Sequence, residues 1–547
     1  MREEALSDIA RVEIIDLPPD SNHNINPQDW SFAQRVQIQW TLLKTWCQSV
    51  MSEFESGNMF KSRTVDPLIS TNTMLRDQFN LHKLIFIVTK NGNVYGVDSL
   101  SSDIKWKTRV ASLESCSIQT LIVSDTNIHS GSVMLVGKCS DQTTEMIQIN
   151  PMTGERGATN TLNGESVLRV EVLKSHHNHV HPAIVLTKGQ SDFDVNAQVI
   201  GSDLEAQATD IHTELKWTSF WLVNNEIGQV RGGRVKLNED GFKGSFDNEW
   251  TFQTQTDHKI SAISAPLASD IIHSQGRPLA NRGVLYKFLN PNILSVVTES
   301  TEQTNIEAMA ITLYLIDAIT GQMLHSANHK RSTGPVNIVF AENWVVYSYW
   351  AAKMHRTEIT AVELYKGDSS PNITHWDSRD QDTPVAVQKS FVVSDEITAM
   401  GVTQSQRGIT TKSVLIATKS GNIVSLPRMF LDPRRRLIPE ATDREEGIMP
   451  YDPELKLPPN FNINYNQSIE AVSHIHVAIS GLESTCTVFS HGRSDLFWTR
   501  VQPSNMFDVL KDDFDHAMIS VIMIGFFLGT AACKRLAQLK ITNRLWQ

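Results

Sequence analysis

The chain has 547 residues, of which 40% are hydrophobic and 20% charged, so it is long enough for several domains or one large repeat domain and is not disordered by composition. Its formal net charge is -11. No block of Lys and Arg alternates with aromatic residues, so the composition argues against nucleic acid as a partner.

Five cysteines are scattered along the chain, too few for a disulfide framework, and none forms a CxxC metal or redox pair. Cys116 and Cys139 are the one plausible bridge. Two buried free thiols explain this pair equally well, because unpaired cysteine is often buried in protein cores.

The N-terminal 20 residues carry no basic stretch followed by an apolar stretch, so they do not have the pattern of a signal peptide. Later segments of the chain predict a luminal protein. We therefore expect residues 1–28 to be the remnant of a longer luminal region.

The segment 29–60 carries apolar residues at steps of three and four, which predicts an amphipathic helix. The stripe consists of Phe32, Val36, Trp40, Leu43, Cys47, Val50 and Phe54. Such a helix packs either on its own domain or along a membrane surface. Trp30, Trp40 and Trp46 favour the membrane surface, because Trp prefers the membrane–water boundary. We predict a surface helix in which Trp40, Leu43 and Trp46 are interaction residues.

From about Leu81 to about Arg500 the sequence consists of short β-rich runs separated by turn residues, with no helix of four turns or more. An apolar strand, a Gly-Asn or Thr-Gly turn and a second strand recur. The pattern is found at 84–108, 146–157, 313–324 and 413–427.

One of these runs resembles a known repeat. The stretch 94–98, Val-Tyr-Gly-Val-Asp, followed by Trp106, resembles the blade signature of pyrroloquinoline-quinone (PQQ) propellers, in which the acid and glycine shape a hairpin and the Trp packs between blades. We therefore predict a mainly β, PQQ-like β-propeller over 80–505. At ~40–50 residues per blade it would hold about eight blades. A pair of β-sandwiches is the alternative.

Residues 517–533 form an uncharged apolar run of 17 residues, just long enough to cross a membrane. Acidic residues precede it, and Lys534, Arg535, Lys540 and Arg544 follow it. By the positive-inside rule, residues 534–547 are a cytosolic tail and the earlier chain is luminal, as in a single-pass type I protein. A buried core helix is the alternative for this segment.

Two sequons, at Asn372 and Asn466, lie on the predicted luminal side and are candidate glycosylation sites. Asp515 and Arg535 flank the span and are candidate membrane-edge residues. A carboxylate at the edge of hydrocarbon marks a functional site when it contacts a partner. Equally, Asp515 is explained as a solvated acid at a helix N-terminus.

Several stretches resemble one family over nearly the whole chain. They are 77–83, 273–277, 284–300, 342–350, 431–435, 480–486, 507–515 and 534–546. Together they resemble the first and largest subunit of the endoplasmic reticulum (ER) membrane protein complex, in its C-terminal half or more.

The resemblance implies two luminal propellers, a surface-lying brace helix and one transmembrane helix. It implies a scaffold of a complex that inserts tail-anchored proteins and some first segments of polytopic membrane proteins, the insertion route being formed by other subunits. The implied partners are the other subunits, client transmembrane segments and the lipid bilayer, and the implied location is the ER membrane. The chain departs from the family pattern because its sequence lacks the signal peptide and the earlier luminal part.

The sequence predicts no catalytic, cofactor-binding or metal-binding residues. The histidines at 176, 177, 179 and 181 have metal-ligand chemistry, but no Cys or carboxylate lies at suitable spacing, which favours a solvated loop. No hydrolase elbow, zinc-protease or nucleotide-binding motif is found. Two rival functions remain. One is a quinone-dependent dehydrogenase, although such enzymes usually carry a vicinal disulfide and no two cysteines of this sequence are adjacent. The other is a luminal receptor or chaperone.

Overall fold

The computed structural model divides into two units, Met1–Pro18 with Arg76–Asp508, and Pro19–Leu75 with Val509–Gln547. The structure describes residues 6, 8–18, 40, 44, 74–77, 79–125, 132–139, 143–162, 167–173, 182–189, 194–201, 204–225, 227–238, 241–267, 270–302, 304–367, 373–379, 383–493, 495–504, 508 and 516–546.

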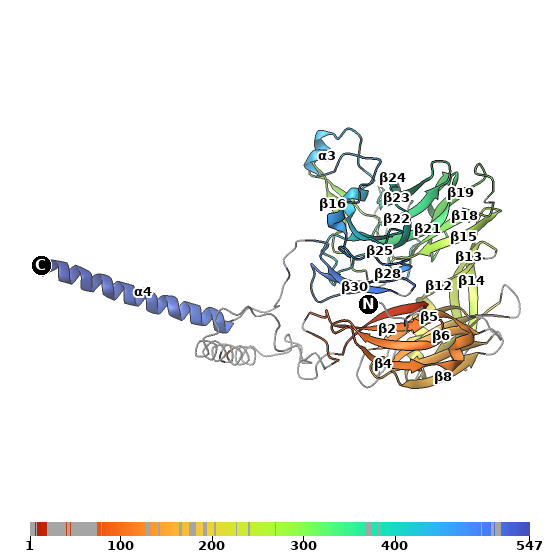
Figure 1. Cartoon of the computed structure of the whole chain (residues 1–547), viewed down its shortest axis with the longest axis horizontal. Coiled ribbons are helices and arrows are strands. Elements are labelled where there is room, and N and C mark those ends of the chain that lie inside the picture. The colour runs from red at the N-terminus through yellow and green to blue at the C-terminus, as the bar shows by residue number, and fades with distance from the viewer. Residues whose placement is uncertain are drawn as a thin grey trace. The chain divides into compact units, whose positions relative to one another are not determined.

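The first unit is built from antiparallel strands that follow one another along the chain (Figure 1). The first two four-stranded sheets contain β1 (Ile9–Asp16), β2 (Lys83–Thr89), β3 (Asn93–Asp98) and β4 (Ile104–Arg109), then β5 (Cys116–Asp125), β6 (Ser132–Cys139), β7 (Thr144–Ile149) and β8 (Arg156–Leu162). Two more contain β15 (His258–Ser264), β18 (Ile293–Ser300), β19 (Ala310–Asp317) and β20 (Met323–Lys330), then β21 (Ser332–Ala341), β22 (Trp344–Ala351), β23 (Arg356–Tyr365) and β24 (Val385–Val393).

The last two sheets have three strands each, β25 (Ile397–Val402), β26 (Ser413–Thr418) and β27 (Ile423–Pro427), then β28 (His474–Ile479), β29 (Cys486–His491) and β30 (Leu496–Val501). A separate hairpin is formed by β16 (Gly276–Pro278) and β17 (Val284–Tyr286). Short helical turns are η3 (Ala111–Ser115), η4 (Arg428–Leu431), α3 (Ala441–Glu445) and η5 (Pro459–Phe461).

One sheet is larger than the others. It contains β9 (Val167–Val172), β10 (Ala183–Lys188), β11 (Val195–Ile200), β12 (Ser219–Asn224), β13 (Gln229–Leu237) and β14 (Lys243–Gln253). Pairing of β11 with β14 joins two runs of three strands into one six-stranded sheet. The described residues thus form seven blades rather than the eight estimated from length. Helix α2 (Leu204–Trp217), which the sequence pattern did not predict, packs on this sheet through Ile211 and Leu215.

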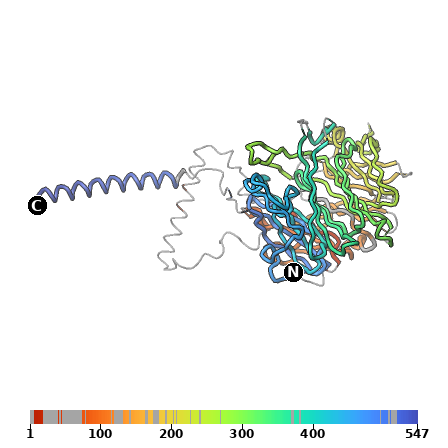
Figure 2. The backbone as a smooth tube through the Cα atoms, turned by 90° about the horizontal axis from the view of Figure 1, so that it is seen from above, coloured from red at the N-terminus to blue at the C-terminus, as the bar shows by residue number. Residues whose placement is uncertain are grey.

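The sheets are arranged as a propeller, because the first strands of successive sheets contact one another. Strand β1 contacts β5 and β28, β21 contacts β15 and β25, and β25 contacts β28. Figures 1 and 2 both place the N-terminal strand beside the last sheet. The predicted propeller is confirmed, and the pair of β-sandwiches is excluded.

The N-terminal strand changes one predicted boundary. Strand β1 pairs antiparallel with β2 from Ile9↔Thr89 to Asp16↔Lys83, so it belongs to the first blade and not to a separate remnant at 1–28. The sequence did not indicate this, because its partner strand begins only at Lys83, far along the chain. The expected helix at 29–60 lies outside the described residues apart from Trp40 and Lys44, which are helical and exposed.

The second strands of several blades form the core. Every residue of β2, β18, β26 and β29 is buried. Each of these strands lies between two other strands of its sheet, and the faces of the sheet pack against neighbouring blades. These strands are buried along their whole length rather than at alternate residues, and they include buried polar residues such as Glu299 and His491.

A tryptophan latch holds neighbouring blades together. The indole N–H of Trp106 on β4 donates to the carbonyl of Pro151 at 2.9 Å, in the turn of the next blade. That of Trp250 on β14 donates to the carbonyl of Ala318 at 3.0 Å. Each ring lies over the glycine of the turn. A Cβ atom on Gly154 would come within 2.4 Å of the Trp106 ring, and one on Gly321 would come within 2.6 Å of the Trp250 ring. The Thr-Gly turns seen in the sequence are therefore docking sites for these rings.

The same latch joins the last blade to the first. Trp498 on β30 donates to the carbonyl of Ser99 at 2.9 Å, across 399 residues of sequence. The acceptor turn matches the two others, because Asp98 accepts the backbone N–H of Leu100 and Ser102 has the left-handed φ of 64° that glycine adopts elsewhere. Trp498 thus closes the ring.

Cys116 and Cys139 form a disulfide between β5 and β6, where the two residues lie opposite each other in the strand register. The structure therefore decides between the two possibilities left open by the sequence. Cys486 is a buried free thiol, and Cys533 is an exposed one.

In the second unit, helix α4 runs from His516 to Leu545. Its part Met518–Leu545 is long and apolar enough to cross a membrane, and none of its apolar span is buried in the structure. The helix continues through most of the predicted tail at 534–547, because Lys534–Leu545 contains no glycine or proline and is rich in strong helix formers.

Candidate functional site

The centre of the propeller contains a cavity of about 690 Å³, lined by the first strands of several blades. Glu13 of β1 and His476 of β28 are among its lining residues. Burial raises the pKa of Glu13 to about 7. Burial, together with the neighbouring rings of His491 and His474, lowers the pKa of His476 to about 3. Near neutral pH Glu13 therefore exchanges between its protonated and ionised forms, and His476 is uncharged.

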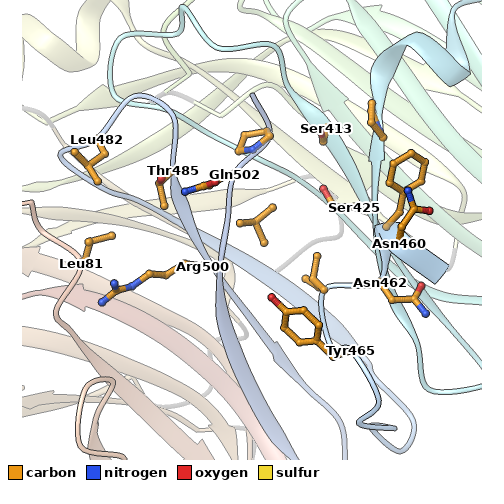
Figure 3. Close-up of a pocket in the computed structure, with 15 residues that line it drawn as sticks. Leu81, Ser413, Ser425, Asn460, Asn462, Tyr465, Leu482, Thr485, Arg500 and Gln502 are labelled. Atoms are coloured by element: carbon orange, nitrogen blue, oxygen red, sulfur yellow. The ribbon is translucent and has the colours of Figure 1, made fainter. Parts of the chain in front are cut away.

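A second cavity, of about 610 Å³, lies between the last two blades. Figure 3 shows Leu81 and Leu482 on one side of it and Ser425, Asn460 and Asn462 on the other, with the Arg500 side chain extending toward Leu81. Arg500 is the one charged side chain among its described lining residues. Leucine and proline side chains with amide and hydroxyl groups make a surface suited to binding an extended or mixed-polarity segment.

The most distinctive arrangement is a cluster of buried and half-buried charges, which we call the acid–base cluster. It contains five acids and five bases, and so it has no formal net charge: Asp270, Glu342, Glu363, Asp432 and Glu446 with Arg277, Lys287, Lys412, Arg428 and Arg434. These residues come from loops and strands that lie up to 176 positions apart in the chain, from 270 to 446.

Glu342 lies at the centre of the acid–base cluster, in the turn between β21 and β22. Its carboxylate is 2.5 Å from Lys287 and 3.7 Å from both Lys412 and Arg428. Burial alone would raise the pKa of Glu342, but the three cations outweigh burial and hold the pKa below its usual value. Ion pairs this buried rarely stabilise a fold much in total, yet removal of one partner leaves a costly unpaired charge.

The cluster joins the β16–β17 hairpin to the segment 428–461, which we call the insertion because it lies between β27 and β28. Arg277 on β16 contacts Asp432 at 2.8 Å and Glu363 at 3.4 Å. Glu446 accepts the backbone N–H of Ala280 at the tip of the hairpin. Figure 1 shows α3 and β16 side by side at one end of the propeller. The cluster therefore holds two protruding segments in fixed positions.

Half of the ten members of the cluster lie in the stretches that carry the family resemblance. Arg277 lies in 273–277, Lys287 in 284–300, Glu342 in 342–350, and Asp432 and Arg434 in 431–435. Sequence reasoning missed them as a site, although one signal was present. Lys287 interrupts the apolar run Val-Leu-Tyr-Lys-Phe-Leu, and a buried lysine requires a partner.

Three of the individually predicted site residues lie in the part of the chain that the structure describes. Asn466 lies exposed in a turn, Arg535 is exposed on α4, and Trp40 is 46% exposed. Asn372, Leu43, Trp46 and Asp515 lie outside the described residues, as do the four histidines at 176, 177, 179 and 181.

Comparison with known proteins identifies the family. The model described as ER membrane protein complex subunit 1, second beta-propeller, matches residues 80–504. Proteins named ER membrane protein complex subunit 1 are 36% identical in Xenopus laevis and 35% identical in Gallus gallus, in each case over 100% of this chain. The chain spans 56% of the length of each of these relatives.

Among solved structures, the β-propeller domain of Cps50 (Swd1) from Myceliophteria thermophila is 11% identical, with a TM-score of 0.32, and the match covers 75% of this chain and 89% of that one. The family is decided by sequence, since the family model covers nearly all of the described propeller and the relatives also match the apolar helix. The chain belongs to the family of ER membrane protein complex subunit 1.

Proposed function

We propose that this chain is a non-catalytic scaffold subunit of the ER membrane protein complex. In this role it supports insertion of tail-anchored and polytopic proteins into the ER membrane, and its partners are the other subunits, client transmembrane segments and the bilayer. The main support is that similarity to the named subunits extends over the whole chain, propeller and apolar helix alike. A rigid propeller with protrusions fixed by the acid–base cluster suits a scaffold.

The experiment is to tag the chain at the C-terminus in its own gene, solubilise membranes in a gentle detergent and purify the chain. Mass spectrometry should find membrane subunits in fixed stoichiometry. Variable luminal cargo would instead support the rival function, a luminal receptor or chaperone. A single-chain species without partners would contradict both.

We also propose a type I orientation, with the propeller luminal and the end of α4 cytosolic. The supporting observation is the charge difference across the span, where Asp512, Asp513 and Asp515 precede it and the basic residues of α4 follow it. A protease added to sealed microsomes should remove a C-terminal tag and leave the propeller intact. Protection of the tag would reverse the orientation.

Glycosylation at Asn372 and Asn466 follows from that orientation. Asn466 is exposed in a turn, as an acceptor must be. Glycosidase treatment should increase the mobility of the native chain. The double change Asn372→Gln and Asn466→Gln should abolish that shift, and a shift that persists would contradict the assignment of these sites.

Asp515 is proposed as a membrane-edge contact for a subunit or client helix. Asp515→Ala should then lower client levels or subunit recovery more than Asp512→Ala or Asp513→Ala does. Equal behaviour of the three variants would leave Asp515 as a solvated acid at the start of the span.

A further inference from the structure

The insertion presents two adjacent aliphatic side chains to solvent. Leu437 is 71% exposed and Ile438 is 85% exposed. Single exposed apolar residues are common on protein surfaces and need no explanation. An adjacent pair this exposed buries little apolar surface in its own fold, so these residues contribute little to folding stability.

The loop that carries the pair is closed at its base. The backbone N–H of Tyr451 donates to the carbonyl of Arg436 at 2.8 Å. The guanidinium of Arg435, itself 4% exposed, donates to the carbonyl of Pro450 at 3.0 Å and to that of Phe430 at 2.5 Å. Both ends of the loop are therefore tied to each other and to η4.

The loop is also tied to the rest of the propeller. Arg434 contacts Glu446 at 3.0 Å and Asp432 at 3.2 Å, and through them it joins the acid–base cluster. Leu431 and Leu455, which flank the loop, are buried in the core of the neighbouring blades. Since the conformation of the loop is fixed before any partner arrives, binding would lose little conformational entropy.

The charges flanking the pair indicate what kind of partner would bind. Arg436 pairs with Glu440, and Arg444 and Glu445 are exposed on α3. An apolar centre with a rim of both signs is typical of protein interfaces. A surface that binds anionic lipid is instead mainly basic and aromatic, and the carboxylates here would oppose it.

We propose that Leu437 and Ile438 are an anchor that inserts into an apolar pocket on another protein subunit of the complex, with the surrounding charges meeting opposite charges on its rim. This inference rests on the proposed function as a complex subunit. It adds a definite interaction surface to that function.

The test places a photoreactive amino acid at position 438 of the full chain and irradiates the purified complex. The expected product is an adduct with one stoichiometric subunit, identified by mass spectrometry. An adduct with lipid alone, or no protein adduct, would overturn the proposal.

A second arm uses Leu437→Ser with Ile438→Ser. Recovery of the cross-linked subunit should fall about tenfold or more, as for loss of an interface hot spot, while the melting temperature of the chain stays unchanged. The matched control is Met354→Ser, at a residue that is 60% exposed on a different turn, which should leave recovery unchanged.

The scaffold function and the anchor can be contradicted separately. If no subunits copurify with the wild-type chain, the scaffold function is wrong. If they do copurify, and the double variant retains all of them at wild-type yield, only the anchor is wrong. If the double variant has a lower melting temperature than the wild-type chain, the cross-link at position 438 tests the anchor instead, because it requires no polar substitution in the loop.

Discussion

Two regions of the propeller hold neighbouring segments together by different chemistry. At the tryptophan latches, one ring covers a tight turn and donates a single hydrogen bond, so the contact is mostly apolar. At the acid–base cluster, ten charged groups meet, and most of their side chains are at least nine-tenths buried. Loss of the hydrogen bond in a latch costs little stability, because water can replace that bond. Loss of one charge in the cluster costs much more, because it leaves another charge without a partner.

The largest effect is expected at the centre of the acid–base cluster. Glu342→Ala should destabilise the chain by about 3–5 kcal/mol, because it leaves buried cations without their main counter-charge. Thermal unfolding of the detergent-purified protein measures this. Glu307→Ala is the control, since its ion pair with Arg331 is largely exposed. Equal melting temperatures for the two variants would contradict the view that the cluster depends on each charge.

A smaller effect is expected at the ring-closing latch. Trp498→Ala should cost about 2–3 kcal/mol, less than for a fully buried ring, because the side chain is only partly buried. Trp498→Phe keeps most of the apolar contact but loses the hydrogen bond to Ser99, so it should cost about 1 kcal/mol. If the two variants unfold at the same denaturant concentration, the apolar contact contributes nothing at this junction.

The pH dependence tests the same junction between the first and last blades. Burial, together with neighbouring charges from His474 and Arg11, lowers the pKa of His476 to about 3 and that of His491 to about 4. Each folded pKa lies below the ordinary value of 6.5. Stability should therefore be full above pH 6.5 and fall toward pH 4, by on the order of 1 kcal/mol per pH unit for each histidine.

The stability contribution of Glu13 changes with pH in the opposite direction. Its pKa is raised from 4.5 to about 7, so the stability it contributes is complete below pH 4.5 and is lost as the pH rises through 7. Because this loss runs from pH 4.5 to 7, it opposes the histidine contribution over the same range, and Glu13 adds no further change above pH 7. Glu13→Gln should therefore steepen the fall in melting temperature between pH 6.5 and 4.5, and melting curves from pH 4 to 9 with the same slope as the wild-type chain would contradict the assignment.

The smallest effect is expected for an exposed ion pair at the same junction. Arg493 lies 3.6 Å from Asp8, and its side chain is 82% exposed. Arg493→Ala should change stability by less than about 0.5 kcal/mol, because exposed pairs are weak and the backbone bond from Asp8 to the carbonyl of Arg493 remains. A loss comparable to that of Trp498→Ala would show that charge, and not the ring, holds this junction.

The difference between the two regions also explains what the sequence could predict. Trp106 and the Thr-Gly turns are local patterns, so the amino-acid sequence alone is enough to indicate a propeller. The acid–base cluster is not local, because Lys412 and Asp270 are 142 residues apart and Arg277 and Asp432 are 155 apart. No periodicity brings such residues together.

Trp498 and β1 were missed for related reasons. The turn that accepts Trp498 has Ser102 where the recognised turns have glycine, so the repeat was hidden. Strand β1 lies 67 residues before its partner, measured from Asp16 to Lys83. The anchor at Leu437 and Ile438 was missed because an aliphatic pair in a loop has no periodicity. The exposure of the two side chains becomes evident only from the folded loop, whose base is closed.

The ring-closing latch has a consequence for how the protein is made. The first blade contains Ser99, and its partner Trp498 is synthesised 399 residues later. At about 5–20 residues per second, the edge of the first blade waits roughly 20–80 s for its neighbour during translation. Over that interval the open seam exposes the strand edge and apolar surface that chaperones bind. Variants at the seam should therefore reduce the yield of newly made protein more than they shorten the lifetime of protein already folded.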